Sequence, residues 1–337
     1  MKAGLVTGRE RFELVDVPEP EPRPGTAVAA VALCGICGTD VHGYQSDRPY
    51  NPAICGHEWV GTVAAVGAGV AGLREGDRVV AGIAPACGGC TECVAGRPDY
   101  CVPAFLGMVG RDALAPPHGG FAPRVAVDAR RLVTVHRGLS DVQAAMVEPA
   151  TVALHAVRRT PPRPSETVVV QGCGPIGLFV LQCARAEGAE RLIAVEPNAA
   201  RQGLAASLGA DTVWTPEEAQ AALGERPADL VFECAGAPAA VQAAVDLVRR
   251  GGRVNLVGVT ATATVQPSVW AVKEVTLTGS LGYRHDEFAP VMDLMADGAV
   301  QVEPLHDATV ALAQAADAFA SLAADSAYAV KVLVDPR

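Results

Sequence analysis

The stretch Thr167-Val-Val-Val-Gln171-Gly172-Cys-Gly174-Pro175-Ile176-Gly177 decides the fold of the second half of the chain. A β-branched strand pattern runs directly into three spaced glycines, and an apolar helical pattern follows. In this setting Gly172 permits a tight turn, Gly174 lets the backbone approach a pyrophosphate, and Gly177 lets the helix pack on the strand. The N-terminus of the helix then favours the phosphate charge. The stretch therefore predicts a dinucleotide-binding βαβ unit.

Alternation of strand and helix continues after this stretch. We predict helices over Ile176–Glu187 and Ala200–Leu208, and strands over Val168–Gln171, Leu192–Val195, Leu230–Phe232, Arg253–Val257 and Val275–Thr278. Such alternation favours parallel βαβ units. Glu196 follows the second strand, where a carboxylate can accept hydrogen bonds from ribose hydroxyls and repel the 2′-phosphate of NADP. Arg201 lies five residues on and could offset that repulsion. The pattern indicates a preference for NAD.

The first 150 residues have a different pattern. Short apolar or alternating runs at Val28–Leu33, Val60–Val66 and Arg78–Ile83 predict strands bounded by glycine, proline and charge. A helical pattern covers Leu139–His155, with Pro149 predicting a break or kink. Beyond Tyr283 we expect two helices and a terminal strand, Val330–Val334.

Composition limits the class of protein. The 337 residues are 50% hydrophobic and 19% charged, so the chain can form a sizeable core and suggests two domains. The formal charge is 27 − 37 = −10, without a basic cluster, which argues against nucleic-acid binding. The sequence has neither a signal peptide at its N-terminus nor an apolar run long enough to span a membrane. We therefore expect a cytoplasmic protein.

Four of the ten cysteines are clustered, at Cys87, Cys90, Cys93 and Cys101. Two successive C-x-x-C steps in a glycine-rich loop let several thiolates converge on one ion. Disulfides rarely persist in a reducing compartment, and sets of four thiolates are typical of structural zinc. We predict a structural zinc ion here.

Donor atoms for a second metal are scattered. They occur in two short motifs about twenty residues apart. The first contains Cys37, Asp40 and His42, and the second is His57-Glu58. Glu148 adds a carboxylate much later in the chain. Each motif alone is weak, because a lone histidine or cysteine is usually a core residue. Together they supply sulfur, nitrogen and oxygen donors for a catalytic zinc, which needs only three protein ligands and an open position.

These motifs, in this order, resemble the zinc-dependent medium-chain dehydrogenase/reductases over essentially the whole chain. The resemblance implies an α/β protein. A GroES-like β-rich catalytic domain would span 1–150 and be completed by 284–337. A Rossmann domain with a doubly wound parallel sheet would span 151–283. Glu148-Pro149 is similar to the sorbitol, butanediol and threonine dehydrogenase branch, since the liver-type alcohol dehydrogenases have a cysteine ligand there.

The resemblance also implies roles for individual residues. Cys37 and His57 match ligands of the catalytic zinc, and Glu58 and Glu148 match carboxylates that ligate it, exchange with it or hold its water. Asp40 resembles the carboxylate that orients the zinc histidine. Thr39 resembles the hydroxyl that accepts the substrate proton and passes it through the cofactor ribose to His42. Cofactor contacts are expected at Gly172, Gly174, Pro175, Ile176, Gly177, Glu196 and Arg201.

The function these residues predict is hydride transfer between a secondary alcohol and NAD, assisted by zinc as a Lewis acid, with two zinc ions per chain. The alcohol would be a polyol, diol, sugar-like or amino alcohol. Threonine 3-dehydrogenase and a biosynthetic dehydrogenase of a larger alcohol are alternatives. A non-catalytic zinc-stabilised nucleotide sensor is an alternative of another class, and the complete set of ligand and relay residues argues against it. The family resemblance further suggests a homodimer or homotetramer.

Overall fold

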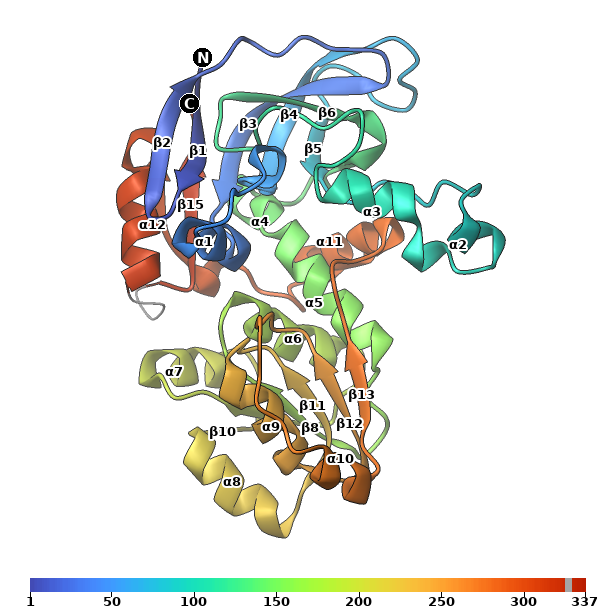
Figure 1. The fold of residues 1–337 in the computed structure, drawn as a ribbon, viewed down its shortest axis with the longest axis vertical. Helices are drawn as coiled ribbons and strands as arrows, with labels where there is room; N and C mark the ends of the chain where they lie inside the picture. The colour runs from blue at the N-terminus through green and yellow to red at the C-terminus, as the bar shows by residue number, and fades with distance from the viewer. Residues whose placement is uncertain (325–328) are drawn as a thin grey trace. The chain divides into compact units, whose positions relative to one another are not determined.

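The computed structural model describes residues 1–324 and 329–337, which form two compact units (Figure 1). The first contains Met1–Glu148, Arg284–Ala296 and Leu305–Arg337, and the second contains Pro149–Tyr283 and Asp297–Pro304. Residues 297–304 join the second unit. There the backbone of Gln301 and the side chain of Gln182 exchange two hydrogen bonds of 2.6 and 3.2 Å.

The first unit is built on β-sheet. Its larger sheet has the strand order β14-β15-β3-β4-β5-β7, with β6 also pairing with β3, and β1 pairs with β2 in a separate ribbon. Neighbours are antiparallel except for β14 and β15, which are parallel. The strands are β1 (Lys2–Gly8), β2 (Arg11–Asp16), β3 (Thr26–Gly35), β4 (Glu58–Val66), β5 (Arg78–Ala81), β6 (Arg124–Asp128), β7 (Leu132–Thr134), β14 (His306–Ala311) and β15 (Lys331–Asp335).

The core of this unit joins the two ends of the chain. Phe12 of β2 stacks on Phe319 of α12 (Ala315–Ala324) with ring centroids 4.7 Å apart, and Phe121 meets both rings edge-on. All three rings are buried, so they contribute both apolar area and ring–ring attraction. The C-terminal segment is therefore part of the same core, and β15 extends the sheet beside β3.

Short helices follow or flank the strands. They are α1 (Gly38–Gln45), α2 (Thr91–Val94), α3 (Val102–Met108), α4 (Asp141–Ala145) and α11 (Phe288–Ala296), while α5 (Val147–Arg159) runs from one unit into the other. The helical pattern around Pro149 breaks at Met146, between α4 and α5, and not at the proline. Pro149 lies in the first turn of α5, where its missing N–H has no partner to lose. The break predicted at Pro149 therefore lies slightly earlier in the chain, at Met146.

The second unit is a parallel sheet with the order β10-β9-β8-β11-β12-β13. The chain enters in the middle at β8, moves to one edge, and then crosses back to β11, which confirms the predicted doubly wound sheet. Its strands are β8 (Thr167–Gln171), β9 (Arg191–Val195), β10 (Thr212–Trp214), β11 (Ala228–Glu233), β12 (Val248–Leu256) and β13 (Thr276–Gly279). Its further helices are α6 (Pro175–Ala186), α7 (Ala199–Ser207), α8 (Pro216–Glu225), α9 (Pro238–Leu247) and α10 (Pro267–Lys273).

In such a sheet ligands bind outside the carboxyl ends of the strands, where the strand order reverses. Here that reversal lies between β8 and β11. Val168, Val169 and Val170 of β8 are fully buried, so the strand is fixed in the centre of the core. Across the described part of the chain, helices are too short or too polar to traverse a bilayer.

Candidate active site

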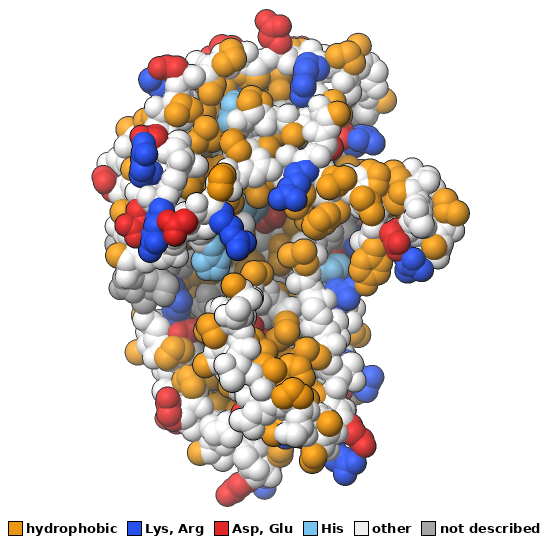
Figure 2. Space-filling view, viewed as in Figure 1, with side chains coloured by type: hydrophobic (Ala, Val, Ile, Leu, Met, Phe, Trp, Pro, Cys, Tyr) orange, Lys and Arg blue, Asp and Glu red, His pale blue; other side chains and the backbone are white. Residues whose placement is uncertain are grey.

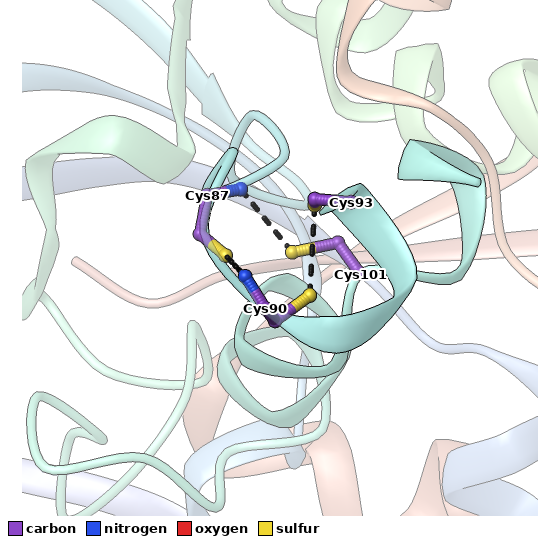
Figure 3. Close-up of side chains that lie close together, drawn as sticks. All are labelled: Cys87, Cys90, Cys93 and Cys101. Atoms are coloured by element: carbon purple, nitrogen blue, oxygen red, sulfur yellow. Dashed lines mark hydrogen bonds between the residues drawn. The ribbon is translucent and has the colours of Figure 1, made fainter. Parts of the chain in front are cut away.

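The four clustered cysteines converge on one point (Figure 3). Their sulfur atoms all lie within 4.8 Å of one another, and the Cys90 and Cys93 sulfurs are 3.5 Å apart. The backbone N–H of Cys87 donates to the Cys101 sulfur, and that of Cys90 donates to the Cys87 sulfur. Backbone N–H groups of Cys93 and Val102 lower the pKa of Cys90 to about 6. This segment, residues 87–101, is called the cysteine loop below, and its donors fit a tetrahedral zinc ion.

A second set of donors lies at the ends of two paired strands. Cys37 caps the N-terminus of α1 just after β3, and Glu58 begins β4 directly opposite Gly35. His57 precedes Glu58 and follows Gly56, whose φ of 78° makes the turn into the strand. Donor atoms of Cys37, His57 and Glu58 lie within 4.8 Å of one another. These three residues are called the Cys37 cluster below.

The electrostatics of the Cys37 cluster favour a bound cation. Burial and the Glu58 charge raise the pKa of Cys37, which disfavours the thiolate. Burial would lower the pKa of His57, but the charges of Cys37 and Asp40 outweigh it and raise that pKa. A metal ion binds cysteine as the thiolate and histidine as the neutral imidazole. The positive charge of a divalent cation would stabilise the Cys37 thiolate and would replace the proton that His57 otherwise holds. The donor set therefore fits zinc.

The ring of His57 is oriented by a backbone carbonyl. Its Nδ1 donates to the Ile54 carbonyl oxygen at 3.0 Å, which leaves Nε2 as the ligand nitrogen. Asp40 Oδ1 also lies 3.8 Å from Nδ1, an ion-pair contact longer than a hydrogen bond, so the role of Asp40 in orienting this ring stays a prediction. The buried Asp40 carboxylate accepts from the Tyr50 hydroxyl at 2.8 Å and from the N–H groups of Gly56 and Cys37 at 3.1 Å. Asp40 thus fixes the backbone beside both ligands.

Two further charged residues, Lys331 and Glu148, act on the Cys37 cluster. Lys331 of β15 is buried and donates from Nζ to Glu58 Oε2 at 2.6 Å. Sequence reasoning overlooked Lys331, although a lysine inside an apolar terminal strand was the available indication. Glu148 is buried in the first turn of α5, and its charge contributes to the raised pKa of both His57 and Lys331. Glu148 is not one of the three donors that approach within 4.8 Å, so a carboxylate near the metal comes first from Glu58.

The two relay residues lie on α1. Thr39 is exposed in the first turn, and its N–H donates to the Cys37 sulfur at 3.4 Å. His42 follows one turn later and is exposed. Residues three apart share a helix face, so the threonine hydroxyl and the imidazole lie on the same side of α1.

The glycine loop of the second unit has the shape its sequence indicates. Gly172 has a φ of 90°, and a Cβ there would lie 2.6 Å from the Ala235 nitrogen. A Cβ on Gly177 would lie 1.8 Å from the Gly172 oxygen, so only glycine lets α6 start this close to the loop. A Cβ on Gly174 would meet open space, which leaves that face free for a ligand. Pro175 and Ile176 form the first turn of α6, whose N-terminus attracts phosphate.

Glu196 is buried directly beneath this loop. Its Oε2 accepts from the Cys173 N–H at 2.7 Å and its Oε1 from the Asn198 N–H at 3.0 Å. The carboxylate is thereby held at the carboxyl end of β9, beside the glycine loop. Arg201 lies in the first turn of α7, three residues after the helix cap Asn198.

Comparisons with known proteins agree with both units. The alcohol dehydrogenase GroES-like domain model matches residues 23–137, and the zinc-binding dehydrogenase model matches residues 175–297. The chain is 34% identical to 2-dehydro-3-deoxy-L-galactonate 5-dehydrogenase of Pseudoalteromonas atlantica, covering 96% of this chain and 95% of the relative. It is 33% identical to (R,R)-butanediol dehydrogenase of Bacillus subtilis over the full length of both chains. It is 34% identical to L-threonine 3-dehydrogenase of Streptomyces avermitilis over 87% of each chain.

Two solved structures resemble the fold and contain a cofactor. A zinc-binding dehydrogenase of Sinorhizobium meliloti bound to NADP is 30% identical with a TM-score of 0.86, covering 99% of both chains. The rspB alcohol dehydrogenase of Escherichia coli, complexed with NADH, is 28% identical with the same TM-score and coverage.

The chain therefore belongs to the zinc-dependent medium-chain alcohol dehydrogenases. It is an oxidoreductase that transfers a hydride between a secondary alcohol and NAD, and zinc and NAD are its cofactors.

Proposed function

We propose that the substrate is a secondary alcohol with a second polar group on the neighbouring carbon, as in a diol, a polyol, a sugar acid or an amino alcohol. The observation that carries this proposal is the Cys37 cluster, in which one sulfur, one imidazole and one carboxylate converge beside the buried charges of Lys331 and Glu148. A site this polar favours a substrate that brings a second hydrogen-bonding group, because such a group can hydrogen-bond to the charged side chains around the metal and a simple alkyl chain cannot.

Cys37 and His57 would hold the catalytic zinc, with Glu58 or Glu148 as the carboxylate, and the cysteine loop would hold the structural ion. The bound zinc supplies Lewis-acid stabilisation of the deprotonated alcohol, and NAD accepts the hydride. The protein's own part is to orient these groups. Asp40 fixes the two ligand segments through the Cys37 and Gly56 N–H groups, and the Ile54 carbonyl fixes the imidazole.

The proton released by the alcohol would leave through Thr39. Thr39 lies two residues after Cys37, the N-cap residue of α1, on the exposed first turn of the helix, and His42 follows on the same face. A hydroxyl can accept a proton only if it passes one on, so the threonine serves as a relay and the imidazole as its outlet to solvent.

Cofactor contacts would be made by the glycine loop, by the first turn of α6 with Pro175 and Ile176, and by Glu196. The carboxylate of Glu196 is held in place by two N–H groups and keeps lone pairs for ribose hydroxyls. Its negative charge disfavours a 2′-phosphate, while Arg201 would contribute the opposite charge. We expect kcat/KM for NAD to exceed that for NADP, and equal values would contradict this role of Glu196.

The two compact units support a division of labour between domains. Residues 1–150 with 284–337, apart from 297–304, would form the GroES-like catalytic domain, and 151–283, to which 297–304 are added, the Rossmann domain that binds NAD. All ten cysteines are free, which is compatible with the reducing cytoplasm as the location.

We further propose that copies of the chain associate as a homodimer or homotetramer. Strand β13 lies at the edge of the Rossmann sheet, and the nearby Val272, Leu277 and Leu281 are exposed. An exposed edge strand with apolar neighbours is a surface that a second strand can cover. A second apolar surface lies on the lobe of α2 and α3, where Figure 2 shows hydrophobic side chains gathered and where Val94 and Val102 are exposed.

A substrate panel tests the proposed function. Zinc-replete protein is assayed for NADH formation with matched pairs such as 2,3-butanediol and 2-butanol, together with polyols, sugar acids and L-threonine. The proposal expects kcat/KM for the best bifunctional alcohol to exceed that of its matched monoalcohol by at least about tenfold, the worth of one good hydrogen bond to a charged group. Equal values for the matched pairs would contradict it. Turnover of L-threonine alone would establish the amino alcohol as the substrate class.

A further inference from the structure

Lys331 and Glu58 form a buried ion pair across an intervening strand. The ammonium Nζ lies 2.6 Å from Glu58 Oε2, and the two side chains are only 3% and 2% exposed. Nζ also donates to the Ile36 carbonyl oxygen at 3.1 Å. Since the strand order is β15-β3-β4, the lysine reaches from one strand past the next to meet the carboxylate on the third.

Gly35 makes this crossing possible. It lies on β3 directly between the partners, paired with Leu333 of β15 on one side and with Glu58 of β4 on the other. A Cβ at Gly35 would lie 2.4 Å from Glu58 Oε2, so any larger residue would displace the carboxylate. The backbone at this position is thus shaped for the Glu58 carboxylate in the place where Lys331 holds it.

Negative charge surrounds this single ammonium. The charges of Glu58, Cys37 and Glu148 raise the pKa of Lys331, although burial alone would lower it. Asp40 adds a further buried carboxyl group beside His57. A zinc ion with two positive charges would not balance a thiolate together with these carboxylates, and uncompensated buried charge is costly. The Lys331 ammonium and the metal would therefore together compensate the negative charge of the site.

We propose that Lys331 is a positioning residue that competes with the catalytic zinc for the Glu58 carboxylate and so limits how firmly Glu58 ligates the ion. This inference rests on the proposed metal site at the Cys37 cluster. A carboxylate oxygen of Glu58 lies within 4.8 Å of the Cys37 and His57 donor atoms, and Oε2 of the same carboxylate accepts from the ammonium. The carboxylate is therefore within reach both of an ion at the Cys37 cluster and of the ammonium, and its hydrogen bond to Lys331 would keep a coordination position open for the alcohol.

If Lys331 competes with the metal for Glu58, its removal should slow the loss of metal from the Cys37 cluster, whereas a merely structural role predicts faster loss. Lys331→Met removes the charge and keeps the length of the side chain. Glu58 then has the metal as its one cationic partner and ligates it fully, so metal is lost more slowly and the open position closes. If Lys331 only supported the fold, its loss would loosen the ligands and metal would leave faster.

The experiment uses full-length protein with zinc at the cysteine loop and cobalt at the Cys37 cluster. In Lys331→Met we expect cobalt loss to a chelator to slow by about tenfold, in the range typical for residues that contact metal ligands. We also expect its visible d–d bands to weaken as a ligand is added. Lys331→Arg keeps the charge and should restore both readouts. Lys273→Met is the matched control, because Lys273 Nζ donates to three carbonyl oxygens and, among residues 1–324 and 329–337, to no carboxylate.

A double-mutant cycle isolates the route of the effect. In a Glu58→Gln background, Lys331→Met should leave the cobalt release rate unchanged. If Lys331→Met does not fold, Gly35→Ala replaces it, since the added methyl pushes the carboxylate away from Lys331 and should slow cobalt loss in the same way. Cobalt loss at the wild-type rate or faster in the variant that folds would overturn the inference. Failure of the wild-type Cys37 cluster to take up any metal would instead overturn the proposed function.

Discussion

The cysteine loop and the Cys37 cluster both gather metal donors, yet they are assembled in opposite ways. The loop takes all four donors from residues 87–101, and Cys87 is exposed at the surface. The cluster takes its donors from the ends of β3 and β4, and its Glu58 is buried together with the neighbouring Asp40 and Lys331. A local site can be formed by short chain closure with the metal, whereas a distributed site exists only after the sheet has formed. Loss of metal should therefore affect folding at the first site and chemistry at the second.

The largest expected effect is that of Cys37→Ser. Removing this sulfur takes away a ligand that the other donors cannot replace, so turnover should fall below detection while the sheet that presents the site remains. We expect the metal content to fall from two ions to one and the melting temperature to stay within a few degrees. The measurements are NADH formation, elemental analysis and a thermal melt followed by circular dichroism. Measurable turnover, or a large fall in the melting temperature, would contradict the claim that the Cys37 cluster serves chemistry and the cysteine loop serves folding.

The relay tests whether the Cys37 cluster works together with α1. Thr39→Val removes the hydroxyl and keeps the shape, so kcat should fall by about 10²–10⁴-fold, as for other proton-transfer groups. NAD affinity, measured by fluorescence titration, should stay unchanged. His42→Gln should have a smaller effect because water can replace the imidazole at the exposed end of the relay. Turnover of Thr39→Val close to wild type across neutral pH would assign the proton to another group.

The same contrast explains how much of the molecule could be predicted from its sequence. The cysteine loop could be predicted in full, because its spacing alone brings the sulfurs together. The parallel sheet could be predicted because Val168–Gln171 and the glycines after it carry both periodicity and turn geometry. The Glu58–Lys331 pair could not, because 273 residues separate its members and only the β15-β3-β4 order brings them together.

Local detail was harder to predict than overall topology. Asp40 was predicted only as a partner of His57, whereas the residue also lies three positions after Cys37 and accepts from its N–H, as in a capping box. That spacing was visible in the sequence and indicates helix capping. Strand β14, His306–Ala311, was not predicted either. Its alternation of half-buried and exposed residues includes histidine, aspartate and alanine, which have weak strand propensity.

A third prediction concerns the cysteine loop itself. Cys93→Ser should release one metal ion and lower the melting temperature by several degrees, on the scale of about 2–4 °C for each kcal/mol lost in a unit of roughly 150–250 residues. Activity per correctly folded chain should remain within about tenfold of wild type, because the Cys37 cluster stays intact. Differential scanning calorimetry and active-site-normalised turnover measure the two effects. Complete loss of turnover with an unchanged melting temperature would mean that the two regions have exchanged roles.

The smallest expected effect separates thiols within the metal-free protein. Backbone N–H groups lower the pKa of Cys90 to about 6, whereas burial and its neighbours raise that of Cys93 to about 12 and burial raises that of Cys37. A lowered pKa means that the thiolate, the nucleophilic form, persists down to about pH 6. After chelation of zinc, alkylation of Cys90 should therefore be flat above pH 7 and fall about tenfold per pH unit well below pH 6. Alkylation of Cys93 and Cys37 should keep rising through neutral pH.

Peptide mass spectrometry at each pH gives the three profiles, and added zinc should protect Cys90. A single profile shared by all three thiols would show that neither the loop backbone nor burial of the cluster sets their reactivity.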